Sequence, residues 1–236
     1  MLVREPGRQA VFGDVAFAAE PRRAHRTRRG YQPQPHGACC CCWNRSRSPG
    51  AAWRASREHI LDGYLRGDVK DHRPPRFFLN DVIRYWRTIT VDFVGKERAG
   101  GGEKGALRNL KLRLNRKVLF AGGLLPLLLC HRLRADQIRG ELLRQFDMPA
   151  TDRLAEVFLE FDPDAGVRAL SAYDRWLGML ADDDIRAELS ALTRDEGDRN
   201  RRFRTARRDA DDLQNGLLAL LFETPLLPLV RQYGIF

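Results

Sequence analysis

The feature that most constrains the fold is the spacing of apolar residues over the last three quarters of the chain. From residue 56 onward these residues recur at steps of three and four, which is the period of an amphipathic α-helix. The clearest examples are Leu79, Val82, Ile83, Trp86, Ile89 and Phe93 in one segment, and Leu107, Leu110, Leu114, Val118 and Leu125 in the next. β-branched residues are scattered and do not alternate with polar ones. The spacing therefore predicts an all-α protein.

The helical periods predict a bundle of about seven or eight helices joined by short loops. The segments that carry a helical period are 56–67, 77–98, 104–134, 135–146, 152–161, 166–181, 184–193, 199–223 and 225–233. We expect Gly122, Gly123 and Pro126 to bend the long segment 104–134 or to let it pack closely. The Ala99–Gly102 stretch is expected to be a flexible connector.

The first quarter of the chain shows no such period. Residues 1–57 contain eleven Arg, no Lys and only three acidic residues, so they hold most of the net charge of +10. Gly, Pro and Ser interrupt this stretch throughout, which is typical of a disordered segment. We therefore divide the chain into a disordered basic arm, 1–55, and an all-helical domain, 56–236.

Four consecutive cysteines, Cys39–Cys42, allow two interpretations of the arm. In the first, a genuine basic arm binds nucleic acid and a cysteine metal site follows it, although zinc ligands are normally spaced C-x₂₋₄-C. In the second, residues 1–55 are an out-of-frame product of a GC-rich gene. When a run of Cys codons, TGC, is translated one base earlier, it becomes a run of Leu codons, CTG. A run of leucines is typical of a buried apolar segment.

Membrane and secretion signals are weak. The longest dense apolar run, Val118–Cys130, has 13 residues, fewer than the roughly 18–20 that a membrane-spanning helix needs. Charged residues interrupt the N-terminal region where a signal peptide would be apolar. We expect a cytoplasmic protein with no membrane partner.

No catalytic residue and no metal site can be assigned from motifs. Asp162, Asp164 and the run 182–184 stand where helices begin, so they are expected to cap backbone amides. Asp209 and Asp212 lie beside arginines and are expected to form a solvated ion-pair face. The five histidines lack partners at triad spacing, the Gly-rich stretch 99–105 lacks phosphate-loop spacing, and Cys130 is expected to be a buried, inert thiol.

One basic set is a candidate binding site for nucleotides or phosphate. Arginine forks match phosphate oxygens, and lysine adds a compact positive charge. If the helices 77–98 and 104–134 are antiparallel, their cations could line a groove; the alternative is a solvated basic face. The candidate residues are Asn80, Arg84, Arg87, Arg108, Lys111 and Arg113.

The stretches Phe77–Thr88, Leu107–Lys117 and Pro228–Phe236 resemble the C-terminal helical region of bacterial nucleotidyltransferase-domain proteins of the DNA polymerase β-like superfamily. The resemblance covers about residues 56–236. It implies transfer of a nucleotidyl group from a nucleoside triphosphate, with two Mg²⁺ ions held by carboxylates. In that superfamily a Gly-Ser pair and a D-x-D pair carry the chemistry.

This chain departs from the family at its catalytic motifs. It contains no Gly-Ser dipeptide, and Asp162-Pro163-Asp164 lies on a turn downstream of the helices that resemble the family. We therefore expect a helical remnant that is itself inactive and in which no cofactor site is visible. Two alternatives stay open: a non-enzymatic nucleic-acid-binding protein that uses the basic arm, and an assembly module that uses the apolar surface Leu217–Leu229.

Overall fold

The computed structural model describes residues 51–99 and 104–234, and within these ranges the chain is helical and contains no strand. The predicted all-α class is confirmed. The helices are α2 (Ala51–Leu65), α3 (Arg76–Ala99), α4 (Gly105–Lys111), α5 (Lys117–Leu129), α6 (Ala135–Asp147), α7 (Ala150–Phe161), α8 (Pro163–Ala181), α9 (Asp183–Ala191), α10 (Arg194–Gly197), α11 (Arg201–Phe222) and α12 (Leu227–Tyr233). They outnumber the expected seven or eight, since the expected segment 104–134 is divided into α4 and α5 and the four-residue α10 is an additional helix.

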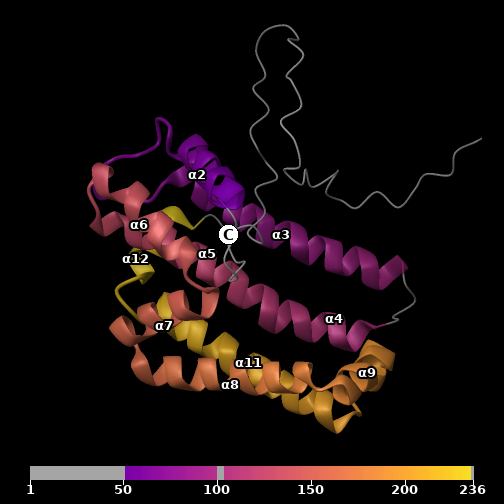
Figure 1. Cartoon of the computed structure of the whole chain (residues 1–236). Coiled ribbons are helices and arrows are strands. Elements are labelled where there is room, and N and C mark those ends of the chain that lie inside the picture. Colours follow the sequence, from indigo (N-terminus) through magenta and orange to yellow (C-terminus); the bar gives the residue numbers. More distant parts are fainter. Residues whose placement is uncertain (1–50, 100–103, 235–236) are drawn as a thin grey trace, which may run out of the picture.

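The long basic segment is divided by an irregular turn. A π-helix, η1 (Leu112–Arg116), joins α4 to α5, and a short 3₁₀ helix, η2 (Cys130–Arg132), follows α5. The helical path from Gly105 to Leu129 thus continues through one wider turn. Figure 1 shows this path running between α3 on one side and α8 with α11 on the other. It is the element on which the other helices are assembled.

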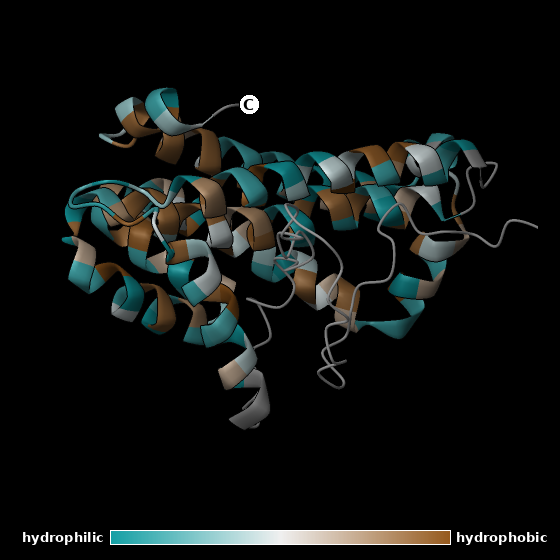
Figure 2. Cartoon of the chain, turned by 90° about the horizontal axis from the view of Figure 1, so that it is seen from above, coloured by the Kyte–Doolittle hydropathy of each residue, from teal (hydrophilic) through white to brown (hydrophobic). Residues whose placement is uncertain are grey.

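Helix α5 contributes to both hydrophobic cores. Its Leu125 belongs to the core formed with α7, α8 and α11, whereas Leu124, Leu127 and Leu128 belong to the core formed with α2, α3 and α6. A helix that is apolar on all sides is stable only when it is covered on all sides. The long outer helices are amphipathic, and Figure 2 shows brown and teal residues alternating along them. Burial of α5 therefore joins the two halves of the bundle.

A buried arginine compensates for a proline inside α5. Pro126 has no N–H, so the carbonyl of Gly122, four residues earlier, loses its helical donor. The Nη1 of Arg153, from α7, donates to this carbonyl at 2.6 Å. The guanidinium also lies over the ring of Phe146, 5.2 Å from its centroid. Arg153 is completely buried, so the hydrogen bond ties α7 to the interrupted turn of α5.

Glycines allow the closest helix contacts. A Cβ added to Gly122 would lie 2.9 Å from the Cβ of Ala150 at the start of α7. A Cβ on Gly216 of α11 would lie 2.7 Å from the Cβ of Ala169 and 3.1 Å from the carbonyl oxygen of Ala165, both on α8. The expectation that Gly122 allows close packing is confirmed, and α8 and α11 use the same device.

The acidic clusters have the local roles expected of them at two helix ends. The Asp162 carboxylate accepts a hydrogen bond from the amide of Ala165 at the start of α8, at 3.0 Å. Asp182 accepts from the amides of Asp184 and Ile185 at the start of α9, each at 3.0 Å. Both carboxylates thereby satisfy free helix amides.

The prediction that Asp209 belongs to a solvated ion-pair face is wrong. Only 3% of Asp209 is exposed, and its Oδ1 lies 2.7 Å from Nη2 of Arg175 on α8. Asp212, one turn later, is half exposed and lies 3.6 Å from the same guanidinium. The pair therefore holds α11 to α8. Neighbouring arginines in the sequence suggested a local pairing, but the actual partner comes from another helix.

Several expectations lie outside the described residues. These include the arm up to residue 50 with its cysteine run, and the expected connector 99–102 except for Ala99, which is the last residue of α3. Helix α2 begins at Ala51, before the expected start at residue 56. Arg57 in this helix is buried and donates to the carbonyl of Phe146 at 2.7 Å.

The membrane and assembly expectations can be compared with the described helices. Among them, none is by itself long and apolar enough to span a membrane; only α11 with α12 reaches that length and composition, across an 85° bend. In the proposed apolar surface Leu217–Leu229, Leu217, Leu220 and Leu226 are buried in the core. Leu218 and Phe222 remain partly exposed.

We predict that Pro126 and Arg153 are energetically coupled. Arg153→Met should leave the Gly122 carbonyl without its donor and destabilise the protein by about 1–3 kcal/mol. In a Pro126→Ala background the helix supplies its own donor, so the same substitution should cost about 1 kcal/mol less. Urea unfolding of the four proteins measures this coupling. Equal costs in the two backgrounds would contradict the assigned role of Arg153.

We also predict opposite effects for two glycines in the α8–α11 pair. Gly216→Ala should destabilise the protein by about 1–3 kcal/mol, because its Cβ overlaps α8. Gly178→Ala is the control: no atom lies within 4 Å of the new Cβ, so it should stabilise by about 0.5–1 kcal/mol. Thermal unfolding followed by circular dichroism measures both, and a neutral Gly216→Ala would contradict the close approach.

Candidate functional site: a polar ladder beside a basic helix

The π-helix η1 turns one polar side chain into the core. Asn115 Oδ1 accepts a hydrogen bond from the indole Nε1 of Trp176 on α8, at 2.7 Å. Its Nδ2 lies 3.5 Å from the hydroxyl of Tyr173. Trp176 is completely buried, so its N–H needs a partner inside the protein. Single π turns are frequent at functional sites, and this one also fixes the orientation of the basic residues around it.

Polar pairs connect the basic helical path formed by α4, η1 and the start of α5 to helix α11. Arg113 Nη1 donates to Asp211 Oδ1 at 3.1 Å, and one turn later Lys117 Nζ donates to Gln214 Oε1. One turn before Arg113, Asn109 faces Arg207 across a small pocket. We call these three successive pairs the polar ladder. The ladder runs along the contact between this helical path and α11, which otherwise pack against each other through apolar residues.

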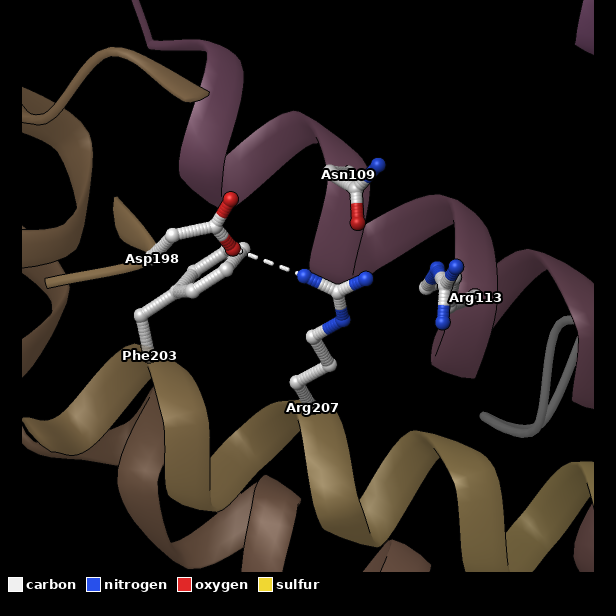
Figure 3. Close-up of a pocket in the computed structure, with 5 residues that line it drawn as sticks. All are labelled: Asn109, Arg113, Asp198, Phe203 and Arg207. Atoms are coloured by element: carbon white, nitrogen blue, oxygen red, sulfur yellow. Dashed lines mark hydrogen bonds and ion pairs between the residues drawn. The ribbon is translucent and has the colours of Figure 1, made fainter. Parts of the chain in front are cut away.

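The pocket forms the open end of the ladder. It encloses about 70 Å³ and is lined by Asn109, Arg113, Asp198, Phe203 and Arg207. Figure 3 shows Arg207 reaching from α11 toward Asp198, while Asn109 and Arg113 descend from the opposite helix. The Arg207–Asp198 ion pair is 2.7 Å long. Phe203 is buried, so the pocket combines one apolar side chain with two guanidinium groups, an amide and a carboxylate.

Lys117 occupies an electrostatically costly position. Burial, together with the nearby charge of Arg113, lowers the pKa of Lys117 to about 8, although Asp211 acts in the opposite direction. A buried ammonium loses hydration, and a neighbouring cation opposes its charge further. An added anion near the ladder would favour the protonated amine.

The candidate residues of α4 and η1 lie near the ladder but have different surroundings. Arg113 lines the pocket. Arg108 and Lys111 are half-buried on α4 and lie outside it. Neither of these two has an ion-pair partner among the described residues, and the same is true of Arg116 at the end of η1. The helix is thus basic on more than one side.

The candidate residues of α3 do not join this pocket. Helix α3 packs closely against α5 and makes few contacts with α4. Arg84 is 72% exposed and lies 3.7 Å from Asp81 of its own helix. Asn80 and Arg87 are also on α3, away from the pocket lining. The structure therefore brings only Arg113 of the six candidates into the pocket.

Trp86 has a packing role in the stretch of alternating aromatic and basic residues on α3. Its ring stacks on Phe120 of α5 with centroids 5.1 Å apart, and Tyr85 packs against the core shared with α5 and α6. This alternation had suggested a nucleotide-binding surface, since bases stack on exposed aromatic rings. Here the Trp86 ring is used to hold α3 on α5.

Sequence reasoning missed Asn109, Asp198 and Phe203 as pocket residues and placed Arg207 in a solvated face. The available signal was the recurrence of polar residues at 109, 113 and 117 beside an apolar stripe, matched by 207, 211 and 214. This recurrence predicts contacts between the two helices only when they are already known to be neighbours.

The remaining candidates for chemistry are structural. Cys130 is a free, buried thiol, and burial raises its pKa to about 12, so it is a poor nucleophile at neutral pH. Across the part of the chain that the structure describes, no three His, Cys, Asp or Glu side chains converge as metal ligands would.

We predict that Lys117 makes stability depend on pH. Its pKa is about 8 in the fold, against 10.5 for an ordinary lysine. Between these values the unfolded chain binds more protons, so the free energy of unfolding rises with pH. Relative to Lys117→Met, the wild type should gain stability from pH 7 to pH 10. Urea unfolding across this range measures the difference, and a flat difference would contradict the assignment.

Comparison with known proteins leaves the geometry as the only guide to function. No protein-family profile, no curated protein and no solved structure matches this chain. The resemblance to nucleotidyltransferase-domain proteins thus rests on the sequence stretches that suggested it, and it stays a prediction.

Proposed function

We propose that the helical domain binds phosphate-bearing polyanions, either nucleotides or nucleic acid, along α4, η1 and the start of α5. In this proposal it is the helical, non-catalytic part of a nucleotidyltransferase-type protein, as the sequence resemblance implies. The support is electrostatic. From Lys104 to Arg134 the sequence contains eight Lys and Arg and no acidic residue, although the chain beyond residue 57 is almost neutral.

The observation that carries the proposal is a set of cations without acidic partners. Arg108, Lys111 and Arg116 are half-buried on one helical path, and none of them has a carboxylate partner within 51–99 or 104–234. Elsewhere, cations such as Arg139 and Arg144 are paired with two carboxylates each. Unpaired neighbouring cations repel one another, and a polyanion relieves this repulsion while releasing its own counterions.

The proposal assigns no catalytic step to the described residues. Nucleotidyl transfer of the kind implied by the resemblance needs carboxylates that converge on two Mg²⁺ ions. Asp162 is engaged as a helix cap, and the described carboxylates form no group of three possible ligands. The residues that the structure describes do not fit a pair of Mg²⁺ ions, and we expect the purified chain to transfer no nucleotide.

Charge reversal tests the proposed surface. In the full chain, Arg108→Glu/Lys111→Glu should weaken binding of a fluorescently labelled single-stranded DNA, measured by anisotropy. It should also reduce the slope of log affinity against log salt by about 1.4, since two phosphate contacts are lost. Arg66→Glu/Arg168→Glu is the matched control, because both residues are exposed and the net charge changes equally.

The competing arm hypothesis makes the opposite prediction. A full chain in which Arg22, Arg23, Arg26, Arg28 and Arg29 are changed to Ser should lose binding if the arm is the contact surface. The α4 variant should then bind normally. If the Arg66→Glu/Arg168→Glu control weakens binding as much as the α4 variant, net charge alone accounts for it and the proposed surface is wrong.

A further inference from the structure

We propose that the pocket at the open end of the polar ladder binds a terminal phosphate, either that of a nucleotide or that at the 5′ end of a nucleic acid. This inference rests on the proposed function, because it assigns one phosphate of the polyanion to one place. The pocket brings together two guanidinium groups and an amide from helices that are far apart in the sequence. The donors are Arg113, Arg207 and Asn109 (Figure 3).

The size of the pocket selects the ligand group. Its volume of about 70 Å³ is several times the roughly 10–15 Å³ that a cavity needs to hold one water molecule. A phosphoryl group is small enough to enter, and we infer that the attached nucleoside stays at the mouth. A terminal phosphate has one ester oxygen leading out of the pocket. An internal phosphodiester has a sugar on both sides and cannot be enclosed in the same way.

A dianionic phosphate can replace the two carboxylates that neutralise the guanidinium groups of the pocket. The two guanidinium groups are held by Asp198 and Asp211, whose side chains are 57% and 56% exposed. Ion pairs this exposed contribute only about 0–1 kcal/mol each, so exchange of partners costs little. A terminal phosphate carries a charge of about −1.5 to −2 near neutral pH. It can accept hydrogen bonds from both arginine forks at once, while the released aspartates are hydrated.

The surroundings of the pocket add to this preference. Phe203 is buried and adds an apolar wall to the pocket. Lys117 lies one turn beyond Arg113 and is influenced by the charges of Arg113 and Asp211. An anion bound nearby stabilises its protonated form. Arg108 and Lys111 lie outside the pocket on the same helical path, so a chain that ends in the pocket has further cations to contact.

A pair of oligonucleotides tests the inference in the full chain. They have one sequence and differ only in carrying a 5′-phosphate or a 5′-hydroxyl. The wild type should bind the phosphorylated strand about tenfold more tightly, as expected for charge-assisted hydrogen bonds net of the lost ion pairs. Arg207→Gln and Arg113→Gln should each abolish this preference. Arg202 lies on α11 like Arg207 but is paired with Glu188 of α9, so Arg202→Gln should keep the preference.

A further variant should act in the opposite direction. Asp198→Asn removes the carboxylate that competes for Arg207, so the preference for the 5′-phosphate should increase. AMP and inorganic phosphate are then added as competitors. Displacement by both indicates that the phosphate group alone is recognised, and displacement by AMP alone indicates that the attached nucleoside also contributes; either result supports a terminal-phosphate site.

The outcomes separate this inference from the proposed function. If both strands bind equally well and Arg108→Glu/Lys111→Glu still weakens them, the pocket assignment is wrong and the basic surface stands. If neither strand binds the wild type, both proposals are wrong. Loss of the preference in Arg202→Gln as well would also overturn the pocket assignment, since that side chain does not line the pocket.

Discussion

The hydrogen bond from Arg153 to the Gly122 carbonyl supports the helix on which the whole bundle depends. Helix α5 is covered by α7 and α11 on one side and by α3 and α6 on the other. Water therefore cannot donate a hydrogen bond to a backbone carbonyl that has lost its helical donor. Pro126 breaks one turn of α5 by removing such a donor. Arg153 supplies the missing donor from α7, and Gly122 leaves room for the backbone of α7 to approach. Without this compensation, a proline at the centre of the fold would leave a buried carbonyl unpaired.

The same helical path changes character along its length. Its second half is apolar and buried, whereas its first half carries Arg108, Lys111 and Arg116, which have no carboxylate partner among the described residues. The π turn between them fixes the relation of the two halves, because Asn115 is held by the indole of Trp176. Arg113 and Lys117 then meet α11, and Arg108 and Lys111 stay outside the ladder. The helical scaffold thus holds these cations in place, which supports the proposed contacts with phosphate groups.

Some expectations from the sequence were correct because they depend on local spacing. The positions of the long helices follow from apolar residues three and four apart, and Asp162 and Asp182 cap helices because they directly precede them. Other expectations failed where the partner was distant. Asp209 is buried against Arg175 of α8, and the Trp86 ring packs on Phe120 instead of facing a ligand. The groove expected between α3 and α4 joined candidates that the structure keeps apart.

The sequence by itself determined the all-α class, the helix boundaries to within a few residues and the acid-free, basic character of the segment 104–134. These properties reside in neighbouring residues and need no knowledge of the fold. Only the tertiary structure decided which cations form a pocket. Arg113 and Asp211 are 98 residues apart in the chain, and Asn109 meets Arg207 over a similar separation. Such pairs depend on how helices pack and on the extra residue in the π turn, which shifts the faces of the helix that follows. Neither is encoded in local periodicity.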